Sequence, residues 1–286
     1  MKKTFSHRIF SKREEPFRLR YIFKWCFGDC QVTGQRMLAM IIFMATSILL
    51  STGTARAEYK EVTVENGGSI SGKVAFKGEL PEDAVEHFPV SGKWPGCGTG
   101  VRDVVRIDVA DGALRGVFVL LDGITEGKPW SDAESATVLD QKNCVFLPEL
   151  QIVRAGTRLI VRNSDPEVLH NVNIRELIET SSGRTIEGIL FNIAQPLPGD
   201  IKMKVKPKSS PYLNVGCELH NFMVAYILAP EHPYAVVVEP DGTFLLNDVP
   251  PGDYSLIAWH PKLGKKRTSV TVTAGGELKV DFEFGN

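Results

Sequence analysis

The sequence predicts an all-β protein built from two β-sandwiches. Short runs that alternate between apolar and polar residues recur after residue 57, and Gly- or Pro-rich turns separate them. Short strands at such regular spacing are typical of β-sandwiches. The chain shows no heptad pattern, no low-complexity tract and no repeat of about 20 to 50 residues, which argues against helical bundles and solenoids.

Residues 1–57 have the features of a secretory signal peptide with a long leader. A basic region precedes an apolar run of 14 residues, Met37–Leu50, and the small-x-small pattern Ala55–Ala57 follows. The run is shorter than the about 20 residues of a membrane span. We therefore expect cleavage after Ala57, export to the periplasm and no membrane attachment afterwards. The alternatives are an uncleaved anchor and a translation start at Met37.

The charge balance argues against a nucleic-acid partner. The leader holds ten of the 33 Lys and Arg residues and three of the 34 Asp and Glu residues. Residues 58–286 therefore carry 23 basic and 31 acidic side chains, a net charge of −8 with neutral histidines. An acidic surface repels the phosphate backbone, so no nucleic acid is expected to bind.

Three sections follow the leader: 58–135, 136–230 and 231–286. Turn signals and alternation predict strands over 69–77, 104–109, 116–121, two strands within 144–165, 201–206, 213–217, 224–228, 234–238, 243–246, 255–259, 268–272 and 278–284. The strand at 116–121 is apolar on both faces and should lie centrally. A loop is expected over 78–100, and a short helix or a mobile excursion over the polar stretch 175–188.

One motif carries most of the predicted chemistry. Cys217, His220 and Met223 place a thiolate, an imidazole and a thioether at the spacing Cys-x2-His-x2-Met. These are three of the four ligands of a blue-copper site, and His170 is the candidate for the second histidine. Asn171 is expected to hydrogen-bond to the Cys217 loop and hold the thiolate. The sequence thus predicts one type 1 copper ion.

The cysteines fit this assignment. Cys26 and Cys30 lie in the leader, which leaves Cys97, Cys144 and Cys217. An odd number in an exported protein is explained if Cys217 binds the metal and a disulfide joins Cys97 to Cys144. The alternative is that Cys97 and Cys144 are buried free thiols.

The section 136–230 resembles the cupredoxins, and its ligand loop is most similar in spacing to that of amicyanin. The matching residues are Phe146-x-Pro148, Gly156, Asn163-x-Asp165, His170-Asn171 and Cys217-x2-His220-x2-Met223. The resemblance implies a Greek-key β-sandwich, copper bound by His170, Cys217, His220 and Met223, and electron exchange with a redox protein such as a cytochrome or a dehydrogenase. An exposed edge of His220, rimmed by Leu219 and Phe222, would be the docking surface. Asn221 departs from the proline of amicyanins.

The flanking sections resemble a carboxypeptidase regulatory-like, transthyretin-type sandwich. The matching residues are Gly68-x-Ile70-x-Gly72-x-Val74, Asp241-Gly242-x-Phe244 and Val249-Pro250-Pro251-Gly252-x-Tyr254. The opening strand precedes the cupredoxin-like section and the remainder follows it. One sandwich interrupted by another is therefore expected, and three consecutive β sections are the alternative.

Two functions remain open from the sequence. The first is a one-electron carrier, and the second is a non-redox module that holds copper or binds a carbohydrate or a partner. An enzyme is not expected, because the chain lacks His-x-His pairs, a nucleophile elbow, a phosphate loop and a His-Glu-x-x-His helix. His232 and His260 are expected to have structural roles, with a second metal site as the alternative.

Overall fold

The described residues, 58–93, 95–131 and 137–285 of this computed structural model, form β-strands and two 3₁₀ turns but no α-helix. The prediction of an all-β protein is confirmed. The described residues fall in one unit, Ala57–Asn286, and none of their helical turns is long and apolar enough to cross a bilayer. The predicted signal peptide lies outside the described residues.

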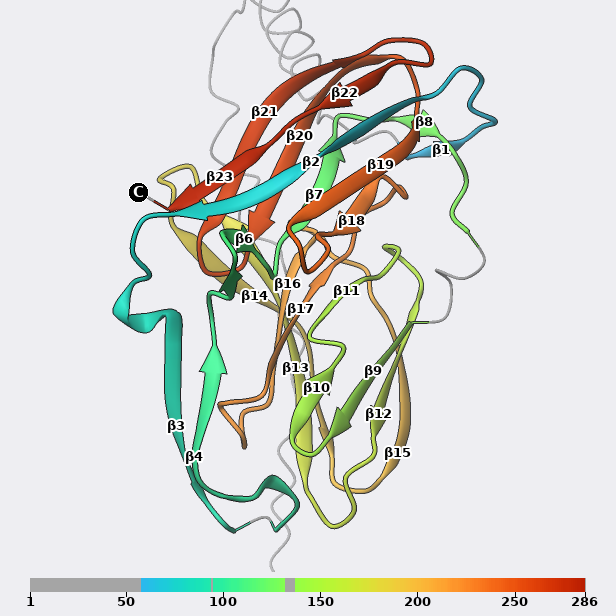
Figure 1. The fold of residues 1–286 in the computed structure, drawn as a ribbon. Coiled ribbons are helices and arrows are strands. Elements are labelled where there is room, and N and C mark those ends of the chain that lie inside the picture. Colours follow the sequence, from blue (N-terminus) through green and yellow to red (C-terminus); the bar gives the residue numbers. More distant parts are fainter. Residues whose placement is uncertain (1–57, 94, 132–136, 286) are drawn as a thin grey trace, which may run out of the picture. The chain divides into compact units, whose positions relative to one another are not determined.

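The first sandwich takes strands from both ends of the described chain (Figure 1). One of its sheets has the order β18 (Ala235–Val237), β7 (Phe118–Asp122), β20 (Gly252–His260), β21 (Gly264–Val272). The other has the order β19 (Thr243–Val249), β2 (Gly68–Lys77), β6 (Ala113–Leu114), β5 (Val109–Ala110), and β2 also pairs with β22 (Glu277–Lys279) and β23 (Phe282–Gly285). Residues 68–77, 109–122 and 235–285 therefore share two sheets and one apolar core.

The second sandwich is formed by the residues between these two parts. One sheet has the order β10 (Val145–Leu147), β9 (Thr137–Lys142), β12 (Arg158–Asn163), β15 (Gly199–Lys204). The other has the order β11 (Leu150–Ile152), β17 (Val224–Leu228), β16 (Tyr212–Gly216), β13 (His170–Glu179), β14 (Thr185–Gln195). The stretch 175–188 is the end of the β13–β14 hairpin, so the predicted helix or excursion is wrong there.

The central position of β7 explains its apolar sequence. Val119 and Leu121 point into the core of the first sandwich, whereas Phe118 and Leu120 belong to a third apolar cluster. That cluster joins the outer face of the sheet to residues of β16 and β17, and Trp259 of β20 lies within it. A strand buried on both faces needs apolar residues at consecutive positions, as the sequence predicted.

A hairpin leaves the first sandwich and packs on the second. It consists of β3 (Val85–Ser91) and β4 (Thr99–Val105), with the 3₁₀ turn η2 (Pro95–Cys97) at its tip and η1 (Glu82–Ala84) before it. Phe88, Val90 and Val104 contact the core of the second sandwich. The predicted loop over 78–100 is therefore wrong over β3 and over Thr99 and Gly100, which begin β4. A short parallel pair, β1 (Lys60–Glu61) and β8 (Glu126–Gly127), completes the described strands.

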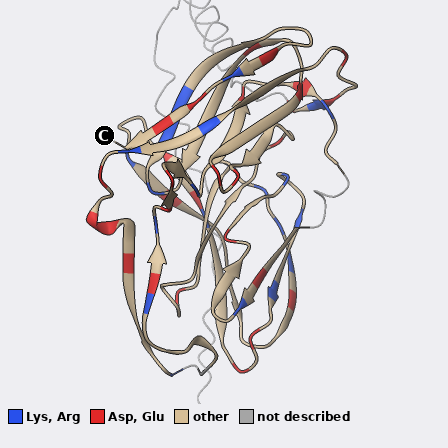
Figure 2. Ribbon diagram, in the orientation of Figure 1, with Lys and Arg blue, Asp and Glu red and all other residues tan. Residues whose placement is uncertain are grey.

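Charged residues of both signs are interspersed over the described strands of both sandwiches (Figure 2). Several of them pair across strands, as Arg162 does with Asp200 and Arg267 with Asp122.

His260 predicts a specific loss of stability in acid. Its ring is buried, and Nδ1 accepts the backbone N–H groups of Lys262 and Leu263. Burial lowers the pKa of His260 from 6.5 to about 4. The unfolded chain therefore binds a proton at a pH at which the folded protein does not, so stability falls as the pH drops below 6.5.

We expect His260 to account for a loss of about 3 kcal/mol between about pH 7 and pH 4. Urea unfolding of the wild-type chain and of His260→Gln at both pH values measures this contribution. The variant should lose less stability over that interval, and an equal loss in the two proteins would contradict the prediction.

Candidate metal centre

The sheet β13–β16–β17 brings the predicted ligands to one end of the second sandwich. His170 is the first residue of β13, Cys217 follows the last residue of β16, and Met223 precedes β17. β13 and β16 pair antiparallel with Asn173 opposite Gly216, so the start of one strand lies beside the end of the other. The order of strands thus places two residues 47 positions apart next to each other.

The loop from Cys217 to Met223 consists of two successive turns. The N–H of His220 donates to the carbonyl of Cys217 at 3.2 Å, and the N–H of Met223 donates to the carbonyl of His220 at 2.8 Å. Each turn spans four residues, Cys217–His220 and His220–Met223, which fixes the relative positions of the three side chains. Cys217 and Met223 are buried in the core of the second sandwich, as the alternation of Leu213, Val215 and Cys217 predicted.

Three ligand atoms converge between these elements. One donor atom each of His170, Cys217 and His220 lies within 4.8 Å of the other two. Cys217 Sγ is 3.6 Å from His220 Nδ1, and the two imidazole rings meet edge to face at 5.0 Å between centroids. His170 Nδ1 is buried and has no hydrogen-bond partner among the described residues. A metal ion with bonds of about 2 Å fits between these atoms.

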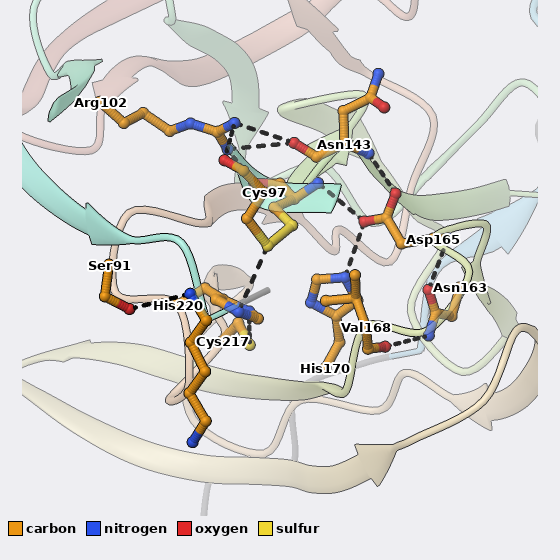
Figure 3. Close-up of a disulfide and its surroundings, with 12 residues drawn as sticks. Ser91, Cys97, Arg102, Asn143, Asn163, Asp165, Val168, His170, Cys217 and His220 are labelled. Atoms are coloured by element: carbon orange, nitrogen blue, oxygen red, sulfur yellow. Dashed lines mark hydrogen bonds and ion pairs between the residues drawn. A yellow bond between two sulfur atoms is a disulfide. The ribbon is translucent and has the colours of Figure 1, made fainter. Parts of the chain in front are cut away.

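Asp165 orients His170. Its carboxylate is 2.9 Å from His170 Nε2, and it also accepts the backbone N–H groups of Asn143 and Cys144 (Figure 3). Because the carboxylate accepts the proton of Nε2, the lone pair of Nδ1 is left free to bind a metal. Asp165 belongs to the matching motif Asn163-x-Asp165 in the sequence, but no role was predicted for it.

Asn171 links the two ligand-bearing segments. Its backbone N–H points at Cys217 Sγ at 3.5 Å, and its Oδ1 accepts the N–H of Glu218 at 2.7 Å. These contacts hold the sulfur at a fixed distance from β13. Hydrogen bonds to a thiolate also stabilise its charge, which helps to set the redox potential of a bound copper.

Burial sets the protonation of the metal-free site. Burial raises the pKa of the Cys217 thiol, although the backbone N–H groups of Asn171, Leu219 and His220 partly oppose this. Burial also lowers the pKa of His170 despite the nearby Asp165. Burial and the adjacent His170 lower the pKa of His220 to about 4. At neutral pH both imidazoles are therefore neutral and ready to bind a metal ion, which displaces the thiol proton.

The outer side of His220 is covered, which contradicts the predicted exposed edge. His220 is only 3% exposed, and its Nε2 lies 3.6 Å from Cys97 Sγ (Figure 3). The disulfide between Cys97 and Cys144 is confirmed, and it fastens the tip of the β3–β4 hairpin over this ring. Leu219, predicted to rim the docking surface, is 49% exposed, whereas Phe222, predicted to rim it as well, is buried.

The other histidines of the described residues are His87, His232 and His260, and none of them belongs to the ligand cluster. His232 Nδ1 accepts the N–H of Tyr234, and His260 caps a turn in the same way. Neither is part of a cluster of potential metal ligands among the described residues. His87 is exposed on β3 and pairs with Asp103. These contacts favour structural roles for His232 and His260.

Comparison with known structures finds copper proteins of the cupredoxin type. A reduced Cu(I) form of an amicyanin variant is 15% identical, with 39% of this chain and 98% of that chain covered and a TM-score of 0.25. A novel purple cupredoxin from Nitrosopumilus maritimus is 16% identical, with 33% and 99% covered and a TM-score of 0.25. A Cu-containing nitrite reductase from Thermus scotoductus SA-01 is 13% identical, with 38% and 24% covered and a TM-score of 0.25.

Comparison with protein families gives a match in the C-terminal part only. Residues 229–280 match the family described as Polysaccharide lyase family 4, domain II. No curated protein sequence matches the chain. The match covers most of the section 231–286, one of the two sections that resemble a carboxypeptidase regulatory-like domain. Because the matching family is a different one, that resemblance stays a prediction.

Proposed function

We propose that this protein is an exported type 1 copper protein that carries single electrons. The observation that supports this most directly is the convergence of three buried donor atoms from His170, Cys217 and His220, with Nδ1 of His170 left without a partner among the described residues. A buried polar atom without a partner costs free energy unless a ligand satisfies it. Two imidazoles and one thiolate are the donor set that copper favours in such sites.

The residues of the site would hold copper with little rearrangement. His170, Cys217 and His220 would supply the three close ligands, and Met223 the distant thioether. Copper would supply a one-electron couple between Cu(I) and Cu(II). The chain's contribution is to fix the ligands: Asp165 orients His170, Asn171 holds the Cys217 loop, and the β3–β4 hairpin excludes water from His220.

The cellular setting and the partner belong to the proposal as well. The disulfide suits an oxidising compartment, which supports export through the predicted signal peptide to the periplasm. A cytochrome or dehydrogenase as redox partner stays a prediction, as does the absence of enzymatic activity.

The purified protein is expected to bind one Cu(II) per chain and to show a strong visible thiolate-to-copper charge-transfer band that disappears on reduction and returns on oxidation. Because that band requires the Cys217 sulfur, Cys217→Ala should abolish it. His87→Ala removes an exposed imidazole on β3 and should leave the band unchanged. A wild-type protein that binds no copper, or an unchanged spectrum in Cys217→Ala, would contradict the proposal.

A copper-holding protein is the second candidate, and the covered His220 favours it, because a buried ligand set releases metal slowly. Stable binding of Cu(I) without the visible band on oxidation would support that role. A carbohydrate-binding module, which the sequence also left open, is a third candidate, and the name of the family that matches residues 229–280 supports it. Binding of an oligosaccharide to the metal-free protein would test it.

A further inference from the structure

The metal centre is closed on all sides, because its four predicted ligands, His170, Cys217, His220 and Met223, are all buried. A hydrated metal ion cannot pass between close-packed side chains, so part of the fold has to move before the ion reaches these atoms. The β3–β4 hairpin is suited to that movement. Its two strands pair only with each other among the described strands, so it belongs to the sheets of neither sandwich.

The tip of the hairpin rests on both ligand-bearing segments. Cys97 Sγ lies 3.6 Å from His220 Nε2. Gly96 approaches the loop before His170 so closely that a methyl group at its Cα would lie 3.0 Å from Val168 Cγ2. Lifting the tip would therefore uncover the imidazole of His220 and the loop that carries His170.

The tip is held by one covalent bond and by weaker side-chain contacts. The disulfide joins Cys97 to Cys144 in the β9–β10 turn. The guanidinium of Arg102 donates to the carbonyls of both cysteines (Figure 3). Phe88 and Val90 of β3 are only partly buried where they pack on the second sandwich. Because a two-stranded hairpin is marginally stable by itself, the disulfide supplies much of the restraint.

Building on the proposed function, we propose that the β3–β4 hairpin is the gate of the metal centre and that the disulfide between Cys97 and Cys144 is its latch. The metal ion enters while both cysteines are thiols, and it is trapped once they are joined. In latching, the two thiols give two electrons and two protons to the disulfide of a thiol–disulfide exchange partner. One S–S bond forms in this chain, and the partner's S–S bond breaks to give two thiols. A dithiol reductant reverses the step and lets the metal leave.

The first test follows the Cys217 thiol in the metal-free, full-length chain, so it does not depend on bound copper. The wild-type chain is compared with the double variant Cys97→Ser/Cys144→Ser and with Leu256→Ala, which weakens the core of the first sandwich away from the hairpin. Alkylation of Cys217 by iodoacetamide under native conditions is quantified by peptide mass spectrometry. Hydrogen exchange is measured on the same three proteins.

We expect Cys217 to be alkylated at least about tenfold faster in the double variant than in the wild-type chain, and in Leu256→Ala to stay within about twofold of it. Hydrogen exchange in the double variant should accelerate over β3, β4 and the loop 217–223 and stay unchanged in β7 and β20. An unchanged alkylation rate in the double variant would overturn the gate. So would an equal acceleration in Leu256→Ala, or faster exchange throughout the double variant, because Cys217 would then be reached by unfolding of the whole chain.

The second test concerns trapping. Transfer of Cu(I) from the loaded protein to a chelator should be at least about tenfold faster for the double variant than for the wild-type chain. Equal transfer rates would overturn the latch. If the wild-type chain binds no copper, the proposed copper function fails, whereas the alkylation and exchange results on the metal-free protein still decide whether the hairpin is a gate.

Discussion

Replacing Asp165 by alanine is expected to lower the free energy of unfolding by about 3 kcal/mol and to weaken copper binding by about 10- to 100-fold. Asp165 is 4% exposed, and its carboxylate joins His170 Nε2 to the backbone of the β9–β10 turn. Without it, an imidazole N–H and two backbone N–H groups are buried unpaired. His170 also loses the contact that keeps Nδ1 free for the metal.

Two measurements check this expectation. Urea unfolding of the metal-free protein gives the stability change, and competition with a chelator of known affinity gives the change in copper binding. Asp200→Ala is the matched control, because Asp200 forms an exposed ion pair with Arg162. We expect this variant to keep a urea midpoint close to that of the wild-type protein. If Asp165→Ala behaves like Asp200→Ala in both assays, the role assigned to Asp165 is wrong.

Trp259→Ala is expected to destabilise the protein by about 3–5 kcal/mol. Trp259 is 4% exposed between the two sandwiches, where its ring lies 5.4 Å from Phe118 and 4.6 Å from Tyr212. Its removal leaves a cavity in the apolar cluster that joins β20 to the second sandwich. Since Trp259 belongs to the first sandwich and Tyr212 to the second, the loss should weaken their association as well as the local packing.

Thermal and urea unfolding followed by far-UV circular dichroism measure the effect. Leu245→Ala serves as the control, because Leu245 on β19 is 49% exposed and is not one of the buried core residues. We expect its midpoints to stay close to those of the wild-type chain. A loss of less than about 1 kcal/mol for Trp259→Ala would show that the cluster does not hold the two sandwiches together.

Local patterns in the sequence were enough to predict the all-β fold class, the central strand β7 and the disulfide partner of Cys97. Alternation along 213–217 also predicted that the Cys217 side chain points inward. Each of these features depends on side-chain periodicity or on a count of residues, and both can be read along the chain. The convergence of His170 with Cys217 was predicted from the chemistry of copper ligands, because no local signal joins residues so far apart.

The tertiary structure alone decided what surrounds the Cys217–Met223 loop. The stretch 78–100 looks like a loop because its Pro and Gly residues mark turns, yet it forms the β3–β4 hairpin by pairing with residues up to Val105. Strand pairing is non-local, so the sequence does not state which surface a hairpin will cover. The closed His220 edge and the bonds from Asp165 to the β9–β10 turn both follow from such non-local contacts. The sequence determined which donor atoms are candidates for a metal site, and the fold determined that the β3–β4 hairpin covers one of them.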